Sequence, residues 1–327
     1  MAKYRGRILL VIAALLLLGI IAYSYVYQGR QPLVRKKVSV IVYGDNVQRW
    51  ENFQQGINQA ALDLNAEVTF LTMTDDIGVG EQQSLVNREA RNKAEGLIVA
   101  AVNSKEMIEP IEEINKQIPV VMAETGIYEE KVIYEEVADV PYVSADNREM
   151  GEKLAEIIMS ENDKNEPIYL VDINKQRNPI EVRKEGLTKL LENSGYRITY
   201  WQPEDSSAVL PFVEEQQKLA APGVIVALDE LALEAIIDGT PKLQEGFAIY
   251  GIGSTAKIVY YLDQGAIKGI VFQDEYNMGY TSMIRLFEKI SNKRGISVVN
   301  GEIEVHSANK DNVHLPEEER LLYPIIQ

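Results

Sequence analysis

The chain has 327 residues, of which 46% are hydrophobic and 25% charged, and its formal net charge is −16. This composition is typical of a globular protein, and the length suffices for about two domains. The absence of cysteine excludes disulfide bonds, thiolate nucleophiles and a lipidated cysteine, and two histidines near the C-terminus do not suggest a catalytic triad or a zinc cluster. All 49 acidic residues follow residue 37, so the bulk of the chain would be repelled by nucleic acid.

The N-terminal segment differs in kind from the rest of the chain. An uncharged run rich in Leu, Ile and Ala, Ile8 to Val26, has about the length (~20 residues) that spans a bilayer. We therefore predict a single transmembrane helix and linker over residues 1–37. The alternative is a cleaved signal peptide, because Ala22-Tyr23-Ser24 resembles a cleavage site, but the bulky residues that follow favour an uncleaved anchor. Either interpretation exports the rest of the chain, which we expect on the extracytoplasmic side of the cell membrane.

From residue 38 onwards, short β-branched runs alternate with amphipathic segments. In the first half we predict strands at Val38–Tyr43, Ala66–Met73, Gly96–Ala101 and Ile118–Ala123, and helices at Trp50–Asn65, Glu81–Ala94 and Ser104–Gln117. The strands are too apolar to have one face in water, which is typical of a parallel sheet covered by helices on both sides.

The alternation is interrupted once and then restarts. Residues 126–140 are acidic and irregular, and a short strand, Pro141–Ser144, follows. Further strands are predicted at Ile168–Ile173, Arg197–Trp201, Gly223–Leu228, Phe247–Ile252 and Ile267–Phe272, and helices at Ile180–Ser194, Ala208–Ala220, Asp229–Asp238, Thr255–Gln264 and Asn277–Ser291. The pattern predicts an α/β fold of two doubly wound, Rossmann-like lobes, with a ligand bound in the cleft outside the carboxyl ends of the strands.

Polar side chains follow several of these strands and are our candidates for ligand binding. They are Asp45, Asn46, Arg49, Trp50, Glu124, Thr125, Arg183, Asp229, Ser254 and Gln273. Guanidinium and amide groups suit a polyhydroxylated or anionic small molecule, and an indole can cover the apolar face of a sugar ring.

Structural interpretations remain open for most of these residues. Trp50 could pack in the core, and Asp229 could cap the helix that follows it. Arg49, Arg183 and Glu124 could form ion pairs, while Asp45 and Asn46 could be turn residues.

A glycine motif follows the strand Phe247–Ile252. Gly251-x-Gly253-x-x-Ala256 resembles a dinucleotide fingerprint, but that fingerprint normally opens its fold, whereas here it lies near the C-terminus. We interpret the glycines as a tight turn close to the ligand and expect no cofactor and no metal.

The motifs in their order resemble the type I periplasmic binding proteins for sugars such as ribose and xylose. The matching segments are RWENFQQGINQAA, IPVVMAET, YVSADNREMGEKLAEII, EVRKEGL, GVIVALDELALEAI and YGIGSTAKIVYYLDQGAIKGIVFQDEYNMGY. The resemblance covers about Val38 to Gly301. It implies two lobes joined by a hinge: residues 38–145, completed by about 274–303, and residues 146–273, completed by about 304–327.

The resemblance also implies roles for individual residues. Arg49 and Trp50 would hold a sugar from the first lobe, Arg183 would bind its hydroxyls, and Gln273 would close the site near the hinge. The chain departs from the family at Glu124-Thr125, which replaces an Asp-Arg pair, at Leu228 instead of Asn, and at Gly253 instead of Asp. We therefore expect a sugar-like ligand, but not a common monosaccharide.

These observations predict a membrane-anchored solute-binding protein that presents its ligand to an ABC permease or to a membrane sensor. The alternative is a ligand-sensing co-receptor for a histidine kinase without a transport role. An enzyme on the same fold is less favoured because no nucleophile motif is present. A repressor is disfavoured because a hydrophobic segment, and no helix-turn-helix, precedes Val38.

Overall fold

The computed structural model describes residues 16–17, 35–44, 47–73, 78–127, 140–173, 176–205, 207–239, 243–291 and 300–323. In these ranges, no helix has the length and apolar character required to cross a membrane. The predicted membrane helix lies outside the described residues, apart from Leu16 and Leu17, and so do the candidate site residues Asp45 and Asn46.

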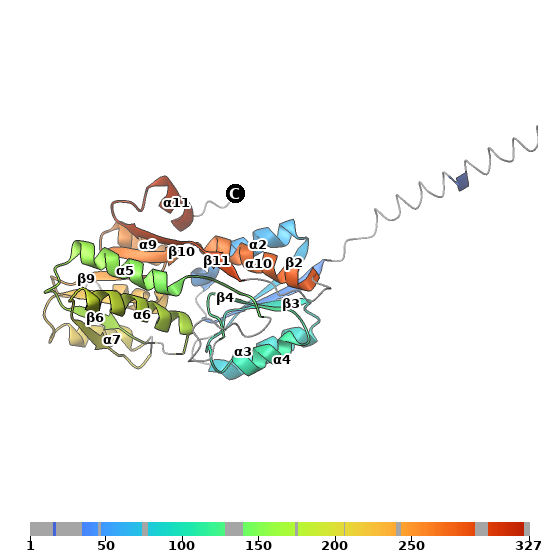
Figure 1. Ribbon diagram of the computed structural model, residues 1–327, viewed down its shortest axis with the longest axis horizontal. Coiled ribbons are helices and arrows are strands. Elements are labelled where there is room, and N and C mark those ends of the chain that lie inside the picture. The colour runs from blue at the N-terminus through green and yellow to red at the C-terminus, as the bar shows by residue number, and fades with distance from the viewer. Residues whose placement is uncertain are drawn as a thin grey trace, which may run out of the picture. The chain divides into compact units, whose positions relative to one another are not determined.

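Residues 37–327 form one compact unit, in which the described residues build two six-stranded sheets (Figure 1). The first sheet has the order β11-β5-β4-β3-β1-β2, with β1 (Lys36–Val42), β2 (Ala66–Thr72), β3 (Gly96–Val99), β4 (Val120–Ala123), β5 (Tyr142–Ala145) and β11 (Gly301–Ile303). The second has the order β12-β10-β9-β8-β6-β7, with β6 (Ile168–Val171), β7 (Ile198–Trp201), β8 (Val224–Ala227), β9 (Ala248–Ile252), β10 (Ile267–Gln273) and β12 (Val305–Asn309). The central strands of both sheets pair in parallel, whereas β12 runs antiparallel to β10.

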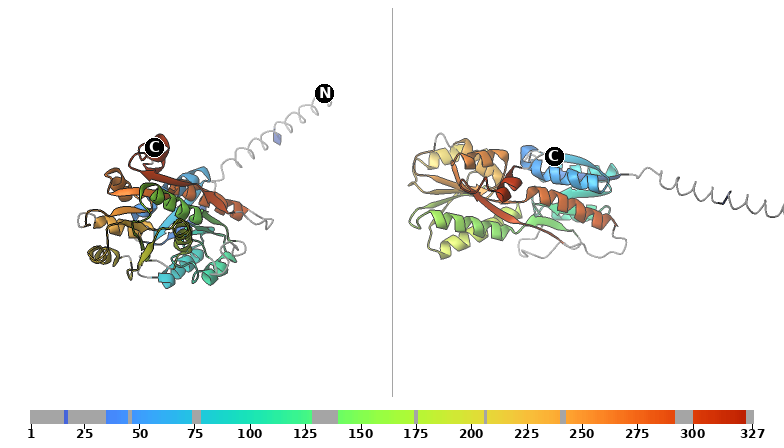
Figure 2. Two further views of the ribbon diagram at one scale, coloured as in Figure 1. Left: turned by 60° about the vertical axis from the view of Figure 1, so that its left-hand side comes forward. Right: turned by 90° about the horizontal axis from the view of Figure 1, so that it is seen from above.

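Helices cover both faces of each sheet and define two lobes (Figure 2). The first lobe contains the 3₁₀ helix η1 (Val47–Trp50) and helices α2 (Glu51–Asp63), α3 (Gly78–Arg91), α4 (Ile108–Asn115) and α10 (Glu275–Ser291). The second contains α5 (Asn147–Glu161), α6 (Asn178–Asn193), α7 (Val209–Gln216), α8 (Glu230–Asp238), α9 (Ala256–Asp263) and α11 (Pro316–Leu322). The chain passes between the lobes at Ala145–Asn147, at Gln273–Glu275 and at Ile303–Val305.

The predicted two-lobe α/β architecture with parallel sheets is confirmed. Each strand and helix predicted after residue 37 has a counterpart, because fully apolar strands and three- to four-residue helical spacing are strong local signals. The elements that we did not predict are η1, α5, β11, β12 and α11. Apart from α5 they are short, and their patterns are too brief to indicate a period. Helix α5 has buried residues at three- and four-residue spacing, a helical pattern that we used only as part of the family resemblance.

Two glycines allow α2 and α10 to touch in the first lobe. A Cβ at Gly56 would overlap the carbonyl oxygen of Tyr276, and one at Gly279 would overlap that of Phe53. Because the obstructing atoms belong to the backbone, only glycine fits at either position. This contact fixes the place of the first turn of α10.

In the second lobe, two glycines likewise allow close contact between α5 and α6. A Cβ at Gly151 would overlap the carbonyl oxygen of Arg183, and one at Gly186 would overlap that of Arg148. The close approach of the two helices therefore sets the position of Arg183 relative to the sheet.

Candidate ligand-binding site between the lobes

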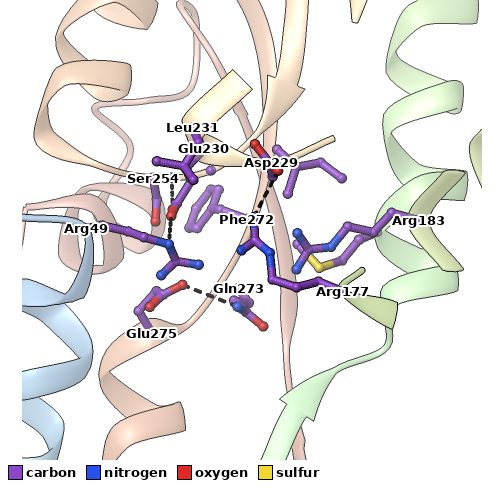
Figure 3. Close-up of a pocket in the computed structure, with 13 residues that line it drawn as sticks. Arg49, Arg177, Arg183, Asp229, Glu230, Leu231, Ser254, Phe272, Gln273 and Glu275 are labelled. Atoms are coloured by element: carbon purple, nitrogen blue, oxygen red, sulfur yellow. Dashed lines mark hydrogen bonds and ion pairs between the residues drawn. The ribbon is translucent and has the colours of Figure 1, made fainter. Parts of the chain in front are cut away.

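The carboxyl ends of the parallel strands enclose a small inner cavity between the lobes (Figure 3). Its volume is about 20 Å³, which is room for about one water molecule. Its charged lining consists of Arg49, Arg177, Arg183, Asp229, Glu230 and Glu275. The inner cavity therefore presents guanidinium and carboxylate groups from both lobes.

Arg49 reaches from η1 into the interlobe space. Its Nη2 donates to Tyr43 Oη at 3.0 Å and to Glu124 Oε1 at 3.4 Å, both in the first lobe. Its Nε forms an ion pair with Glu230 Oε2 of the second lobe at 3.0 Å, without hydrogen-bond geometry. Nη1 is buried and has no hydrogen-bond partner among the described residues. Arg49 thus links the two lobes.

Trp50 does not offer the aromatic face that we expected. Its side chain is completely buried, and its Nε1 donates to Tyr43 O at 2.8 Å. The centroid of its ring lies 5.2 Å from that of Tyr43 and 5.4 Å from that of Phe53, both in edge-on geometry. The guanidinium of Arg49 lies 4.1 Å from the ring centroid. Trp50 is therefore a core residue that supports Arg49, and in this structure its ring packs against Arg49, Tyr43 and Phe53. The local pattern located the indole but not the direction of its side chain.

Glu124 connects the arginines of the two lobes. It follows β4 with a φ of 58° and accepts hydrogen bonds from Tyr43 Oη at 2.7 Å and from the Thr125 hydroxyl. Burial acts to raise the pKa of Glu124, but the attraction of Arg49 and of the two second-lobe arginines outweighs it and lowers the pKa below the ordinary value. Glu124 is therefore ionised. Thr125 is fully buried, and its hydroxyl contacts this carboxylate rather than the cavity.

Arg183 extends from α6 towards the first lobe. Its Nη2 lies 3.7 Å from Glu124 Oε1, its Nε donates to Asn147 Oδ1 at 2.8 Å, and its Nη1 donates to Leu228 O at 3.2 Å. Leu228, which replaces the family's Asn, thus contributes only its backbone here. These contacts hold the guanidinium in the wall of the inner cavity.

Arg177 lies at the interface although we did not select it as a site residue. Its Nη2 donates to Asp229 Oδ2 at 3.3 Å, and its guanidinium lies 4.2 Å from the Tyr43 ring centroid of the other lobe. Asp229 also caps α8, where its Oδ1 accepts from Ala232 N at 2.7 Å. The available signal for Arg177 was its place in the polar run that follows the strand Ile168–Ile173.

Glu230 enters the site because residue 253 is glycine. Gly253 has a φ of 146°, and a Cβ there would overlap Glu230 Cγ. Glu230 Oε1 accepts from the backbone N–H of Ser254 at 3.2 Å. Burial raises the pKa of Glu230, and the attraction of Arg49 offsets only part of this rise. The glycine in place of the family's Asp was the signal by which Glu230 could have been found.

Gln273 and Glu275 lie where β10 passes into α10. Gln273 Oε1 accepts from Ala145 N at 3.3 Å, and its Nε2 donates to Glu275 Oε1 at 3.3 Å, so Gln273 joins two of the crossing segments. Burial raises the pKa of Glu275 to about 8, although the attraction of Arg49 counteracts it. Sequence reasoning missed Glu275, because an acidic residue in the first turn of a helix is ordinary.

A second interlobe cavity, the mouth cavity, adjoins the inner one. Its volume is about 340 Å³, at the lower end of the range of about 300–1,000 Å³ for small-molecule sites. The two cavities share Arg49, Glu230, Ser254 and Glu275. The mouth cavity is also lined by Gln48, Glu51, Asn52, Gln55, Thr255, Ala256, Leu322 and Tyr323. The shared residues therefore form a partition between the two spaces.

The structure thus brings most of the described candidates to one interface. Those that lie there are Arg49, Glu124, Arg183, Asp229, Ser254 and Gln273. Facing guanidinium donors and carboxylate acceptors complement a ligand with several hydroxyl groups. Within the described part of the chain, no group of His, Cys, Asp and Glu side chains is arranged to hold a metal ion.

Comparison with known proteins gives a consistent result. A family model described as a periplasmic binding protein domain matches residues 38–294. No curated protein sequence matches the chain significantly.

Three of the similar solved structures illustrate the fold. A carbohydrate-transporter solute-binding protein from Agrobacterium radiobacter, in complex with D-arabinose, has a TM-score of 0.75 and 16% identity, covering 89% of this chain and 100% of that one. An ABC transporter solute-binding protein from Agrobacterium vitis, bound with alpha-D-tagatopyranose, has a TM-score of 0.77 and 15% identity over 89% and 100%. One from Bacillus halodurans, with bound myo-inositol, has a TM-score of 0.73 and 18% identity over 89% and 99%. At these identities the likeness shows a shared fold.

Proposed function

The chain belongs to the periplasmic binding protein domain family, and from this premise we propose that it is a non-enzymatic solute-binding protein for a small sugar or sugar derivative. One observation carries the proposal: guanidinium and carboxylate groups of both lobes converge at the carboxyl ends of the strands. The similar structures with D-arabinose, tagatopyranose and myo-inositol support a polyhydroxylated ligand.

Ligand capture in this proposal works by exchange of partners. The inner cavity is far too small for a sugar ring, so the lobes must separate to admit one. Separation breaks the interlobe pairs Arg49–Glu230 and Arg183–Glu124. Ligand hydroxyls then replace these partners, accepting from the guanidinium groups and donating to the carboxylates.

We also propose the membrane context. The uncharged run Ile8–Val26 supports an anchor that holds the soluble lobes at the extracytoplasmic face. The similar ABC transporter proteins favour delivery to a permease. A ligand-sensing role beside a histidine kinase is the second candidate, because the altered positions Glu124 and Gly253 set this site apart from the family's transport pattern.

The test of ligand binding uses the full-length chain in detergent. Thermal shift and calorimetric titration measure the binding of a panel of sugars and polyols. A ligand that binds the native state raises the melting temperature of the protein. Arg183→Ala should weaken the best ligand at least tenfold (about 1.4 kcal/mol), whereas Arg285→Ala, at the surface pair with Glu288, should not. If no member of the panel binds, or if Arg183→Ala binds like the wild type, the proposed site is wrong.

A further inference from the structure

The buried charges at the interlobe interface do not balance. Seven Arg, Asp and Glu side chains of the described residues lie buried there, three guanidinium groups and four carboxylates: Arg49, Arg177, Arg183, Glu124, Asp229, Glu230 and Glu275. Arg49 and Arg183 lie within ion-pair distance of Glu124, Arg49 of Glu230, and Arg177 of Asp229. One carboxylate, Glu275, is therefore in excess.

Glu275 has no cation at ion-pair distance among the described residues. Its Oε1 accepts from Gln273 Nε2 at 3.3 Å, and its Oε2 is buried without a hydrogen-bond partner in the described part of the chain. Figure 3 shows the guanidinium of Arg49 beside it, but Arg49 is engaged with Glu230 and, through Nη2, with Glu124. A buried carboxylate without a partner is unfavourable unless a proton or a cation joins it.

We propose that Glu275 recognises a positively charged group of the ligand, and that the ligand is therefore a one-ring polyhydroxylated amine, such as an amino sugar. This inference rests on the proposed function and specifies its ligand class. An ammonium group beside Glu275 supplies the charge that the interface lacks. A neutral sugar forms no ion pair with Glu275, which then keeps its proton, and an acidic sugar adds a like charge next to Glu230 and Glu275.

The mouth cavity gives such a ligand a place once the lobes separate. Glu275 lines both the inner cavity and the 340 Å³ mouth cavity, and its buried Oε2 becomes accessible to a ring there when the lobes part, as the proposed exchange of partners requires. The amides of Asn52 and Gln55 line the same space and suit hydroxyl groups, and the partly exposed ring of Tyr323 offers an apolar face.

Without a cation, a proton fulfils the same need. Burial raises the pKa of Glu275 to about 8, with Arg49 opposing the rise and Glu230 and Glu124 adding to it, while the hydrogen bond from Gln273 lowers it. At pH 7 the carboxyl group is therefore mostly protonated, and a bound ammonium group expels this proton. The start of α10, where Glu275 is the first residue, favours the ionised form because the helix N-terminus carries partial positive charge.

The experiment compares matched ligands by calorimetric titration of the full-length chain in detergent at pH 7. The cationic members are D-glucosamine, D-galactosamine and 1-deoxynojirimycin; D-glucose, D-galactose, N-acetyl-D-glucosamine and D-glucuronate are their neutral or anionic counterparts. We expect at least one cationic member to bind about tenfold or more tightly than its neutral counterpart, a difference typical of one buried ion pair. Titration in buffers of different ionisation enthalpy should show proton release on binding.

Three variants assign the preference to Glu275. Glu275→Gln should reduce the preference to within about threefold and abolish proton release, and Glu275→Asp should retain part of both. Glu288→Gln, an exposed carboxylate on the same helix that lines neither cavity, should change neither. A single cooperative melting transition shows that each variant is folded.

Two outcomes separate this inference from the proposed function. If neutral sugars bind as tightly as their amines, or if the preference survives in Glu275→Gln, Glu275 does not select a cation but the solute-binding function stands. If no member of either set binds, both proposals fail.

Discussion

The two walls of the interlobe site use arginine in different ways. In the first lobe, Arg49 rests on Trp50, which is completely buried, and pairs with Glu124 in the same wall. In the second lobe, Arg183 is held by hydrogen bonds to Asn147 and to a backbone carbonyl. The first wall is thus an extension of the hydrophobic core, while the second is a set of polar contacts on helix α6. Substitutions in the first wall should therefore lower the stability of the fold, and those in the second should chiefly change ligand binding.

Each lobe also supplies a cation to a carboxylate of the other. Arg49 pairs with Glu230 across the interface, and Arg183 pairs with Glu124 in the opposite direction. Buried pairs of this kind add little net stability, because desolvation offsets their attraction. Their reciprocal arrangement instead defines one relative position of the lobes.

Replacement of the core aromatic of the first wall should have the largest effect. Trp50→Ala removes a completely buried indole and leaves a cavity, which should lower the free energy of unfolding by about 3–5 kcal/mol. Urea denaturation followed by circular dichroism measures this change. A variant with wild-type stability and lost ligand binding would restore the stacking role for Trp50 and remove the contrast between the walls.

Removal of the charge that joins the two walls should have the next largest effect. Glu124→Gln keeps the side-chain shape but weakens hydrogen bonds from ionised partners, and we expect a loss of about 2 kcal/mol in the free energy of unfolding. The same urea experiment applies, with Glu185→Gln, in an exposed pair on α6, as the matched control. Equal stability of the two variants would show that the contacts of Glu124 with the arginines of both lobes do not stabilise the fold.

The pH dependence of stability distinguishes Glu275 from the paired carboxylates. The unfolded chain ionises this group near its ordinary pKa of 4.5, and the folded chain near about 8. Between these values the folded state binds the extra proton, so the free energy of unfolding should fall as pH rises, by at most about 1.4 kcal/mol per pH unit. Above pH 8 this contribution levels off.

Glu275→Gln should flatten that decline, and Glu51→Gln should leave it in place. Urea midpoints at several pH values between 5 and 9 (a span of about 4 units around the expected transition) provide the measurement. A decline of the same slope in Glu275→Gln would assign it to another group, of which Glu230, whose pKa is also raised, is the first to test.

An exposed ion pair should have the smallest effect. Arg148 and Glu185 join α5 to α6 at 2.8 Å on the surface of the second lobe. Arg148→Ala should change the free energy of unfolding by at most about 0.5 kcal/mol. A loss as large as that of Glu124→Gln would mean that burial does not set the energetic difference between these pairs.

The fold was more accessible to sequence reasoning than the site. Fully apolar strands such as Val224–Ala227 indicate a parallel sheet. Parallel topology then places Arg49, Arg183 and Gln273 at the carboxyl ends of the strands. Side-chain direction is not a local property, so Trp50 was assigned to the ligand while it packs in the core. Glu275 looked like an ordinary first-turn residue, because its isolation depends on which distant cations are already engaged.

The contacts of Gly56 with Tyr276 and of Gly151 with Arg183 have a consequence for divergence within the family. A carbonyl oxygen cannot rotate away as a side chain can, so alanine at either position must displace a whole helix, and with it Glu275 or Arg183. Ligand-contacting side chains can be exchanged one at a time as specificity changes, but these glycines cannot. We expect relatives that keep this helix spacing to retain both glycines while their ligands differ. The two glycines would then vary less among relatives than the charged residues that contact the ligand.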